Sequence, residues 1–201
     1  MPDTATNGAG RPKESRVTSA LLEAVLEELA ANGFEGATIA AIAARATTSK
    51  QAVYRRYADK TELVAAAVRH ALDQVNPAPP QRASVAEDLR LCLKNTVDAL
   101  QQTPLGGAIR ALVPYRQHPA LKSTLDDLEA NRRLVLRQIF IATSFESDME
   151  IRIDLLLGLI YFRLLIRDIK ITPEDIETAI YLVLGLVAPR DPAGSNSLPG
   201  V

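Results

Sequence analysis

The sequence has little cysteine and no long apolar segment. Cys92 is the only cysteine among the 201 residues, so the chain cannot form an internal disulfide, which suits a reducing compartment. The longest apolar run covers residues 155–162 and is too short to cross a bilayer, and the N-terminus lacks the apolar core of a signal peptide. We therefore expect a cytoplasmic protein that has no membrane partner.

The sequence also lacks the short motifs that mark common catalytic sites. It contains no Gly-rich phosphate-binding loop, no H-E-x-x-H, no G-x-S-x-G and no cysteine cluster. Its two histidines, His70 and His118, lie far apart and do not suggest a metal site. We therefore predict that the protein is not an enzyme and needs neither a cofactor nor a metal ion.

Positive charge is balanced over the whole chain but concentrated in one segment. The net charge of −1 excludes a generally polybasic DNA-binding protein. Between residues 45 and 60, however, the acid Asp59 stands among five cations: Arg45, Lys50, Arg55, Arg56 and Lys60. This local excess fits a protein that touches a DNA duplex with one face.

The periodicity of the chain is helical, and no alternating strand pattern is bounded by hairpin signals. We predict an all-α fold, with an N-terminal three-helix helix-turn-helix domain and a larger C-terminal helical bundle that dimerises. The expected helices cover about residues 16–32, 39–46, 50–57, 59–74, 84–102, 105–112, 119–142, 148–168 and 173–187.

Composition predicts four segments along the chain. The prolines within residues 76–80 must interrupt a helix, so we place the linker between the domains there. The segments are a disordered basic arm (1–14), a DNA-binding domain (15–75), a ligand-binding and dimerisation domain (84–188) and a disordered tail (189–201). Arg11 and Lys13 in the arm are typical of a segment that enters the minor groove, although a tail with two chance cations explains them equally well.

Residues 38–63 carry the pattern of a helix-turn-helix. Thr38, Ser49 and Asp59 are N-cap residues for three successive helices, and residues 46–48 form the turn between the first two of them. Glu62 follows Asp59 at the spacing of a capping box. The second helix of such a motif lies in the major groove, and its first turn meets the base edges.

The first turn of the predicted recognition helix holds residues 50–52. Lys50 can donate to guanine, Gln51 can bind adenine in a bidentate manner, and Ala52 offers a methyl contact to thymine. The residues that suit DNA phosphates are Thr38, Ser49, Tyr54, Arg55, Arg56 and Lys60. The alternative is a solvated charged face on a small helical unit, but the turn, the caps and the interleaved aromatic residues favour DNA binding.

Residues 16–63 resemble the N-terminal domain of the TetR family of transcriptional regulators, named for the tetracycline repressor. The resemblance rests on Gly33-Phe34, Thr38, Ile42-Ala43 and the segment SKQAVYRRYADKTEL from Ser49 to Leu63. It implies a homodimer that binds a palindromic DNA operator and is usually released by a small-molecule effector. It also implies base contacts from Lys50, Gln51 and Ala52, and phosphate contacts from Thr38, Tyr54, Arg56 and Lys60.

The turn departs from the pattern of this family. Thr47 stands where glycine is common, Thr48 where an aliphatic residue is usual, and Ala41 where an acid is frequent. A β-branched residue disfavours a positive φ angle, so the turn is either strained at Thr47 or differently shaped.

The last two predicted helices are apolar on more than one face. Residues 151–169 are apolar nearly all round, and residues 176–187 are similar. A helix with two apolar faces must be buried on both, so we predict a homodimer through the helices near 148–168 and 173–187. The alternative is a central core helix in a monomer.

We expect an effector cavity between the linker and the dimer helices, suited to an apolar or amphipathic molecule. The candidate lining residues are Thr96, Arg110, Tyr115, Phe140, Tyr161 and Arg163. Arg163 lies in an apolar helix and needs a partner, which Asp154 or Asp168 can supply.

The leading hypothesis is therefore a ligand-responsive regulator, in the first place a repressor, that binds DNA as a homodimer. Two alternatives remain open at this point. One is a constitutive DNA-binding dimer that has no effector, and the other is a helical small-molecule-binding protein that does not contact DNA.

Overall fold

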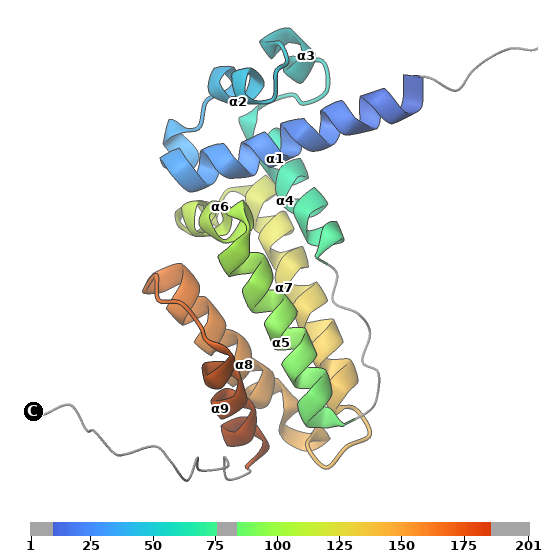
Figure 1. Cartoon of the computed structure of the whole chain (residues 1–201), viewed down its shortest axis with the longest axis vertical. Helices are drawn as coiled ribbons and strands as arrows, with labels where there is room; N and C mark the ends of the chain where they lie inside the picture. The colour runs from blue at the N-terminus through green and yellow to red at the C-terminus, as the bar shows by residue number, and fades with distance from the viewer. Residues whose placement is uncertain (1–9, 76–83, 186–201) are drawn as a thin grey trace, which may run out of the picture.

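The computed structural model describes residues 10–75 and 84–185, and these residues form an all-α structure with no strand among them (Figure 1). Its N-terminal helices are α1 (Gly10–Gly36), α2 (Ile39–Arg45), α3 (Lys50–Tyr54) and α4 (Lys60–Gln74). The second half contains α5 (Val85–Gln102), α6 (Pro104–Leu112), η1 (Val113–Tyr115), α7 (Pro119–Phe140), η2 (Glu146–Asp148), α8 (Met149–Tyr161), the π-helix η3 (Phe162–Ile166) and α9 (Pro173–Leu184). The predicted fold class is confirmed.

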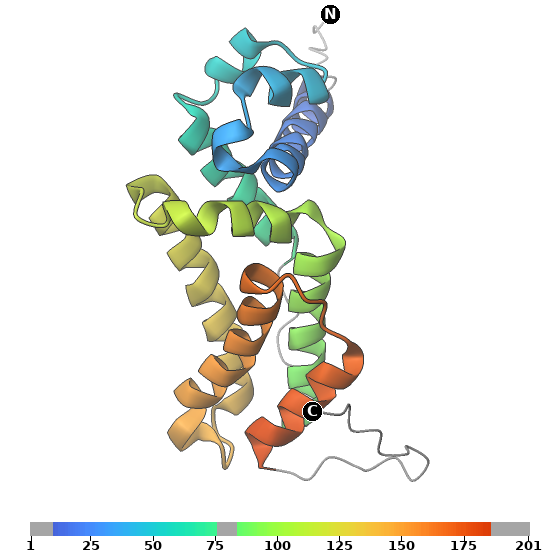
Figure 2. The ribbon, with the colours of Figure 1, turned by 90° about the vertical axis from the view of Figure 1, so that its left-hand side faces the viewer.

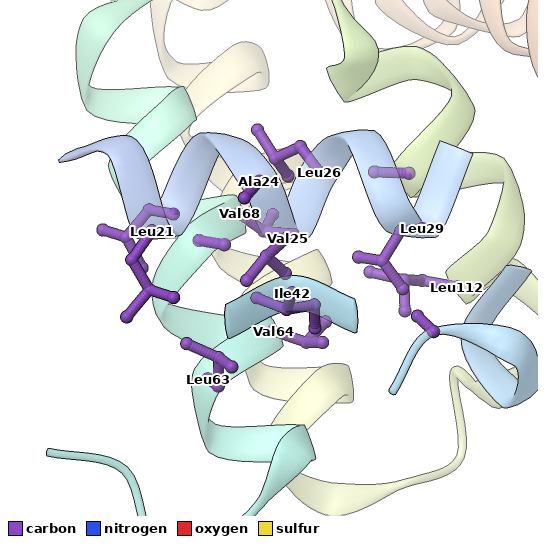
Figure 3. Close-up of a cluster of buried hydrophobic side chains, with 14 of the residues drawn as sticks. Leu21, Ala24, Val25, Leu26, Leu29, Ile42, Leu63, Val64, Val68 and Leu112 are labelled. Atoms are coloured by element: carbon purple, nitrogen blue, oxygen red, sulfur yellow. The ribbon is translucent and has the colours of Figure 1, made fainter. Parts of the chain in front are cut away.

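The small domain is built around one apolar core. Leu21, Val25 and Leu29 project from α1 at helical spacing, and each is at most 1% exposed (Figure 3). Ile42 from α2, Val64 from α4 and Leu112 from α6 belong to the same cluster, so α6 of the second half shares this core (Figure 3). Packing on this core places α2 and α3 at one end of the molecule, on the far side of α1 from the second domain (Figure 1). Helix α3 therefore lies at the surface.

Helices α2, α3 and α4 each begin at a residue whose side chain caps the helix N-terminus, as the sequence predicted. Thr38, Ser49 and Asp59 each accept a hydrogen bond from the backbone N–H three residues on. Glu62 does not close the capping box at Asp59, because its carboxylate accepts the N–H of Ala58 at 2.7 Å instead. The caps fix where α2, α3 and α4 begin and therefore the length of the turn before α3.

The second domain is a bundle in which α5 and α7 run side by side and α8 and α9 lie along one edge (Figure 1). Seen from that edge, α8 lies in front of α5 and α7, between the two in the view (Figure 2). Helix α6 crosses near the top of the bundle and packs directly against α1. The contact is close, because a Cβ on Gly107 would lie 2.7 Å from the Cβ of Ala30. Helix α4 also reaches the bundle, where Arg69 Nη1 donates to Thr124 Oγ1 at 3.0 Å.

Several predicted boundaries need correction. Residues 10–14, assigned to the disordered arm, lie in α1, because Pro12 is tolerated in a first helical turn. Helix α3 ends at Tyr54 instead of residue 57, and the helix predicted over 148–168 divides into α8 and a π-helical segment. The side chains of Arg11 and Lys13, the linker predicted at residues 76–80 and the tail over 189–201 lie outside the described residues.

No helix in the described parts of the chain is both long enough and apolar enough to cross a membrane.

Candidate DNA-binding surface and effector cavity

The N-terminal turn of α3 presents the predicted base-contacting residues. Lys50 and Gln51 are exposed, and Ala52 is half-buried. Val53, the next residue, is fully buried and anchors the helix to the core. The Ser49 hydroxyl accepts the N–H of Ala52 at 3.1 Å, so the backbone of this turn is fixed before any DNA is bound.

The turn that precedes α3 contains a strained residue. Thr47 has a φ of 52°, in the left-handed region that a β-branched residue disfavours. Of the two alternatives that the sequence left open, strain is therefore the one that the structure adopts. The N–H of Thr48 closes the turn by donating to the carbonyl of Ala43 at 2.9 Å.

The predicted phosphate-contacting residues lie around α3. Tyr54 is 54% exposed, and Arg55 and Arg56 are exposed beside it. Arg56 Nη1 donates a hydrogen bond to the Thr18 hydroxyl at 3.4 Å. These exposed positions at the end of α3 suit contacts with a DNA backbone.

Besides Arg56, two more of the five cations in this segment, Arg45 and Lys60, have partners within the fold. Arg45 pairs with Glu27 at 3.1 Å and with Glu28 at 2.7 Å, so its charge is balanced by α1. The hydrogen bond from Arg45 lowers the pKa of the Glu28 carboxyl, and burial opposes that shift. The local charge excess inferred from residues 45–60 is therefore smaller than the sequence count.

Lys60 connects the start of α4 to the end of α1. Its Nζ donates to the carbonyl of Phe34 at 2.7 Å and lies 4.4 Å from the centre of the Phe34 ring. The Phe34 ring also meets Tyr115 of η1, with the ring centres 4.6 Å apart. The phosphate contact expected of Lys60 stays a prediction, since an ammonium group has three donors and one is used here.

A cavity of about 410 Å³ lies in the second domain, next to the DNA-binding domain. Leu72 of α4, Leu105 and Ile109 of α6 and Val113 of η1 line the part of it that faces that domain. The remaining lining residues are Thr96, Leu100, Arg116, Leu125, Leu128, Glu129, Arg132, Tyr161, Phe162, Leu165 and Ile166. The cavity size is within the range of small-molecule sites.

Of the residues predicted to line the cavity, Thr96 and Tyr161 do so, and the other four do not. Arg110 pairs with Asp168 at 2.6 Å, and Tyr115 contacts Phe34. Phe140 is fully buried in the core of the second domain. Arg163 pairs with Asp175 of the first turn of α9 at 2.5 Å, and not with Asp154 or Asp168, because Asp154 pairs with Arg133 and Asp168 with Arg110.

The sequence interpretation missed the charged residues of the cavity. Arg132 is 5% exposed, and its Nη1 donates to the Thr96 hydroxyl at 2.6 Å. Glu129 accepts a hydrogen bond from the Tyr161 hydroxyl at 3.0 Å, and this carboxylate adds to burial in raising the pKa of Tyr161. A signal was present, because Arg132 interrupts the apolar stripe between Leu128 and Leu136.

Comparison with protein families gives a match over both domains. Residues 21–67 match the model described as bacterial regulatory proteins of the tetR family, and residues 79–183 match the tetracyclin repressor-like C-terminal domain. The chain belongs to the TetR family. As a member of this family it is a transcriptional regulator with a helix-turn-helix domain for DNA and a C-terminal domain for ligands.

Individual relatives of this TetR-family chain agree with the assignment. It is 30% identical, over 90% of its length and 94% of the relative, to an HTH-type transcriptional regulator of Mycobacterium tuberculosis H37Rv. A transcriptional regulator from Rhodococcus sp. RHA1 superposes with a TM-score of 0.69 at 21% identity, covering 84% of this chain and 94% of the other.

A further solved structure of the same fold contains ligands. AibR in complex with isovaleryl coenzyme A and operator DNA matches this TetR-family chain with a TM-score of 0.64 and 20% identity. The match covers 87% of this chain and all of AibR. At this level of identity the likeness shows the shared fold.

Proposed function

We propose that this TetR-family chain is a repressor that binds a palindromic operator as a homodimer and is released by a small-molecule effector. The observation that carries the proposal is the cavity, because its wall includes Leu72 of α4, which belongs to the DNA-binding domain, and residues of α6, which packs against α1 of that domain. In AibR the fold holds both a small molecule, isovaleryl coenzyme A, and operator DNA, which supports the pairing of a small-molecule effector with an operator here.

The base contacts in this proposal come from Lys50, Gln51 and Ala52, and the phosphate contacts come from the cations and hydroxyls around α3. Selection of bound DNA from a random pool tests the first part. Lys50→Ala should cost about 1–3 kcal/mol of specific binding and relax the selected sequence at one position. Arg55→Ala should weaken binding to all sequences and lower the salt slope by about one unit. If both variants select and bind DNA like the parent, the assignment of α3 is wrong.

The homodimer in this proposal forms through an exposed apolar face of α8. Ile151 and Leu155 of α8 are 63% and 60% exposed and recur at helical spacing, and Phe162 (54%) and Ile166 (65%) continue the row in the π-helix. We call these four residues the α8 apolar face. On α9, Leu182 is 74% exposed. An apolar row of this kind is typical of a protein interface.

The dimer is tested by charge substitution with a matched control. Leu155→Glu should yield a monomer in sedimentation and lose most operator affinity, because a single domain makes few base contacts. Leu134→Glu alters a comparably exposed leucine of α7 (52%) outside the α8 apolar face and should remain dimeric. A dimeric Leu155→Glu variant would contradict the proposed interface.

Release of DNA follows from the position of α6 in this proposal. Leu105 and Ile109 face the cavity, while Gly107 of the same helix meets α1. A ligand that favours a shifted α6 would move α1 and change the separation of the two recognition helices, which must match successive major grooves. The Tyr115–Phe34–Lys60 contact offers a second connection, from η1, whose Val113 lines the cavity, to the start of α4.

A further inference from the structure

The cavity contains a buried cation that has no acidic partner. Arg132 is 5% exposed and lines the cavity. Among the described residues, the hydrogen-bond partner of Arg132 is the Thr96 hydroxyl, which lies 2.6 Å from Nη1. No carboxylate of the described residues forms an ion pair with Arg132. Burying a charge costs free energy unless it is paired, so an isolated guanidinium in an apolar cavity calls for a counter-ion.

The neighbouring polar groups do not supply that counter-ion. Glu129 lies on the same wall, but one oxygen accepts from Arg133 Nε at 3.0 Å and the other from the Tyr161 hydroxyl at 3.0 Å. Thr96 donates its own hydroxyl proton to the carbonyl of Cys92 at 2.9 Å. Burial lowers the pKa of the Arg132 guanidinium, in keeping with the absence of a nearby acid.

The rest of the wall is apolar. Ten of its fifteen lining residues are leucine, isoleucine, valine or phenylalanine. The other arginine that lines the cavity, Arg116, pairs with Asp126 at 3.6 Å and is exposed. The cavity therefore combines one unpaired buried cation with a long apolar surface.

We propose that the effector is a monocarboxylate with an apolar body, and that its carboxylate binds the guanidinium of Arg132. Arginine presents a planar pair of N–H donors that matches a carboxylate, and Thr96 holds one nitrogen so that the others can meet the ligand. The apolar body would lie along the leucine and isoleucine side chains of α6 and α7. This inference rests on the proposed function, since it names the chemical class of the effector.

A cationic or neutral ligand fits the cavity less well. A cation would have to bind Glu129, and both oxygens of that carboxylate already accept hydrogen bonds. A neutral ligand would leave the charge of Arg132 buried and uncompensated. An acyl coenzyme A carries its charge on phosphates far from a neutral thioester, so it would not place an anion beside an apolar chain in the same way.

The test compares three probes of equal chain length on the full-length parent protein by isothermal titration calorimetry. Decanoate should bind at least about tenfold more tightly than decanol or decylamine, because a charge-assisted hydrogen bond is lost with either substitute. Equal or tighter binding of decanol, decylamine or decanoyl coenzyme A would overturn the proposal. So would the failure of hexanoate, decanoate and tetradecanoate to bind below about 1 mM.

Variants locate the carboxylate within the cavity. Arg132→Gln should remove the preference for decanoate over decanol, whereas the matched control Arg116→Gln should keep it. Arg132→Lys keeps the charge but loses the paired donors, so it should give an intermediate preference for decanoate over decanol. This variant replaces Arg132→Gln in the test if Arg132→Gln does not fold. An unchanged preference in a folded Arg132 variant would overturn the assignment.

Operator release is measured separately by fluorescence anisotropy of a labelled DNA site. If decanoate binds through Arg132 but leaves the DNA bound, the anion site stands and the proposed effector response is wrong. If DNA is released by decanol and decanoate alike, the effector response stands and the carboxylate site is wrong.

Discussion

Replacing Thr47 with glycine should stabilise the protein, although it removes a side chain. Thr47 is exposed and has a φ of 52° in the turn before α3. The left-handed conformation raises the free energy of a residue that carries a Cβ by roughly 1–2 kcal/mol, and it has almost no such cost for glycine. Because the side chain is exposed, its removal sacrifices little buried area.

The gain is partly offset in the unfolded chain. Glycine gives the unfolded state more conformational freedom, which costs about 0.4–1 kcal/mol. The net effect for Thr47→Gly is therefore a rise of about 0.5–1 kcal/mol in the free energy of unfolding. For a protein of this length, that corresponds to an increase in Tm of roughly 1–4 °C.

Thermal and urea unfolding followed by circular dichroism measure this change at fixed protein concentration. The control is Ala44→Gly, at an exposed position within α2, which should lose about 0.5–1 kcal/mol because glycine is unfavourable inside a helix. If Thr47→Gly is no more stable than the parent while Ala44→Gly loses stability as expected, the argument from strain is refuted.

Three other outcomes follow from the packing and the charges. Gly107→Ala should destabilise the contact between α1 and α6 by about 1–2 kcal/mol, and adding Ala30→Gly should recover part of the loss in a double-mutant cycle of urea unfolding. The Cys92 thiol is buried, which raises its pKa to about 11, so alkylation of the native protein should be far slower than that of the unfolded protein at neutral pH. The pKa of Glu28 is lower in the folded than in the unfolded state, so its contribution to stability is present above the unfolded value of about 4.3 and is lost as the pH falls through the folded value. Glu28→Gln should accordingly show a smaller loss of Tm than the parent between neutral and acid pH, and an equal loss would contradict the role given to its pair with Arg45.

The helices, and the starting points of α2, α3 and α4, could be predicted because their causes are local. The stripe from Leu21 to Leu29 and the N-caps Thr38, Ser49 and Asp59 act within a few residues of the chain. The strain at Thr47 was also foreseen as one of two options, since it depends on one residue type at one turn position. Local rules of this kind are legible in a single sequence.

The cavity was harder to predict because its polar groups meet through tertiary contacts. Arg132 and Thr96 are 36 residues apart, and Tyr161 and Glu129 are 32 apart. No spacing rule connects such pairs, so the prediction named aromatic and charged residues by type alone. The ion pairs of Arg45 were not predicted for the same reason, because its acidic partners lie on α1, 17 and 18 residues away.

Phe162 and Ile166 belong to two features at once, since both line the cavity and both are part of the α8 apolar face. In the proposed dimer, a partner subunit on that face would press on the outer wall of the effector site. Binding of effector and association of subunits would then be thermodynamically linked. The dose of effector needed for a given response would consequently depend on how much of the protein the cell contains, so expression level itself would set the sensitivity of the regulator.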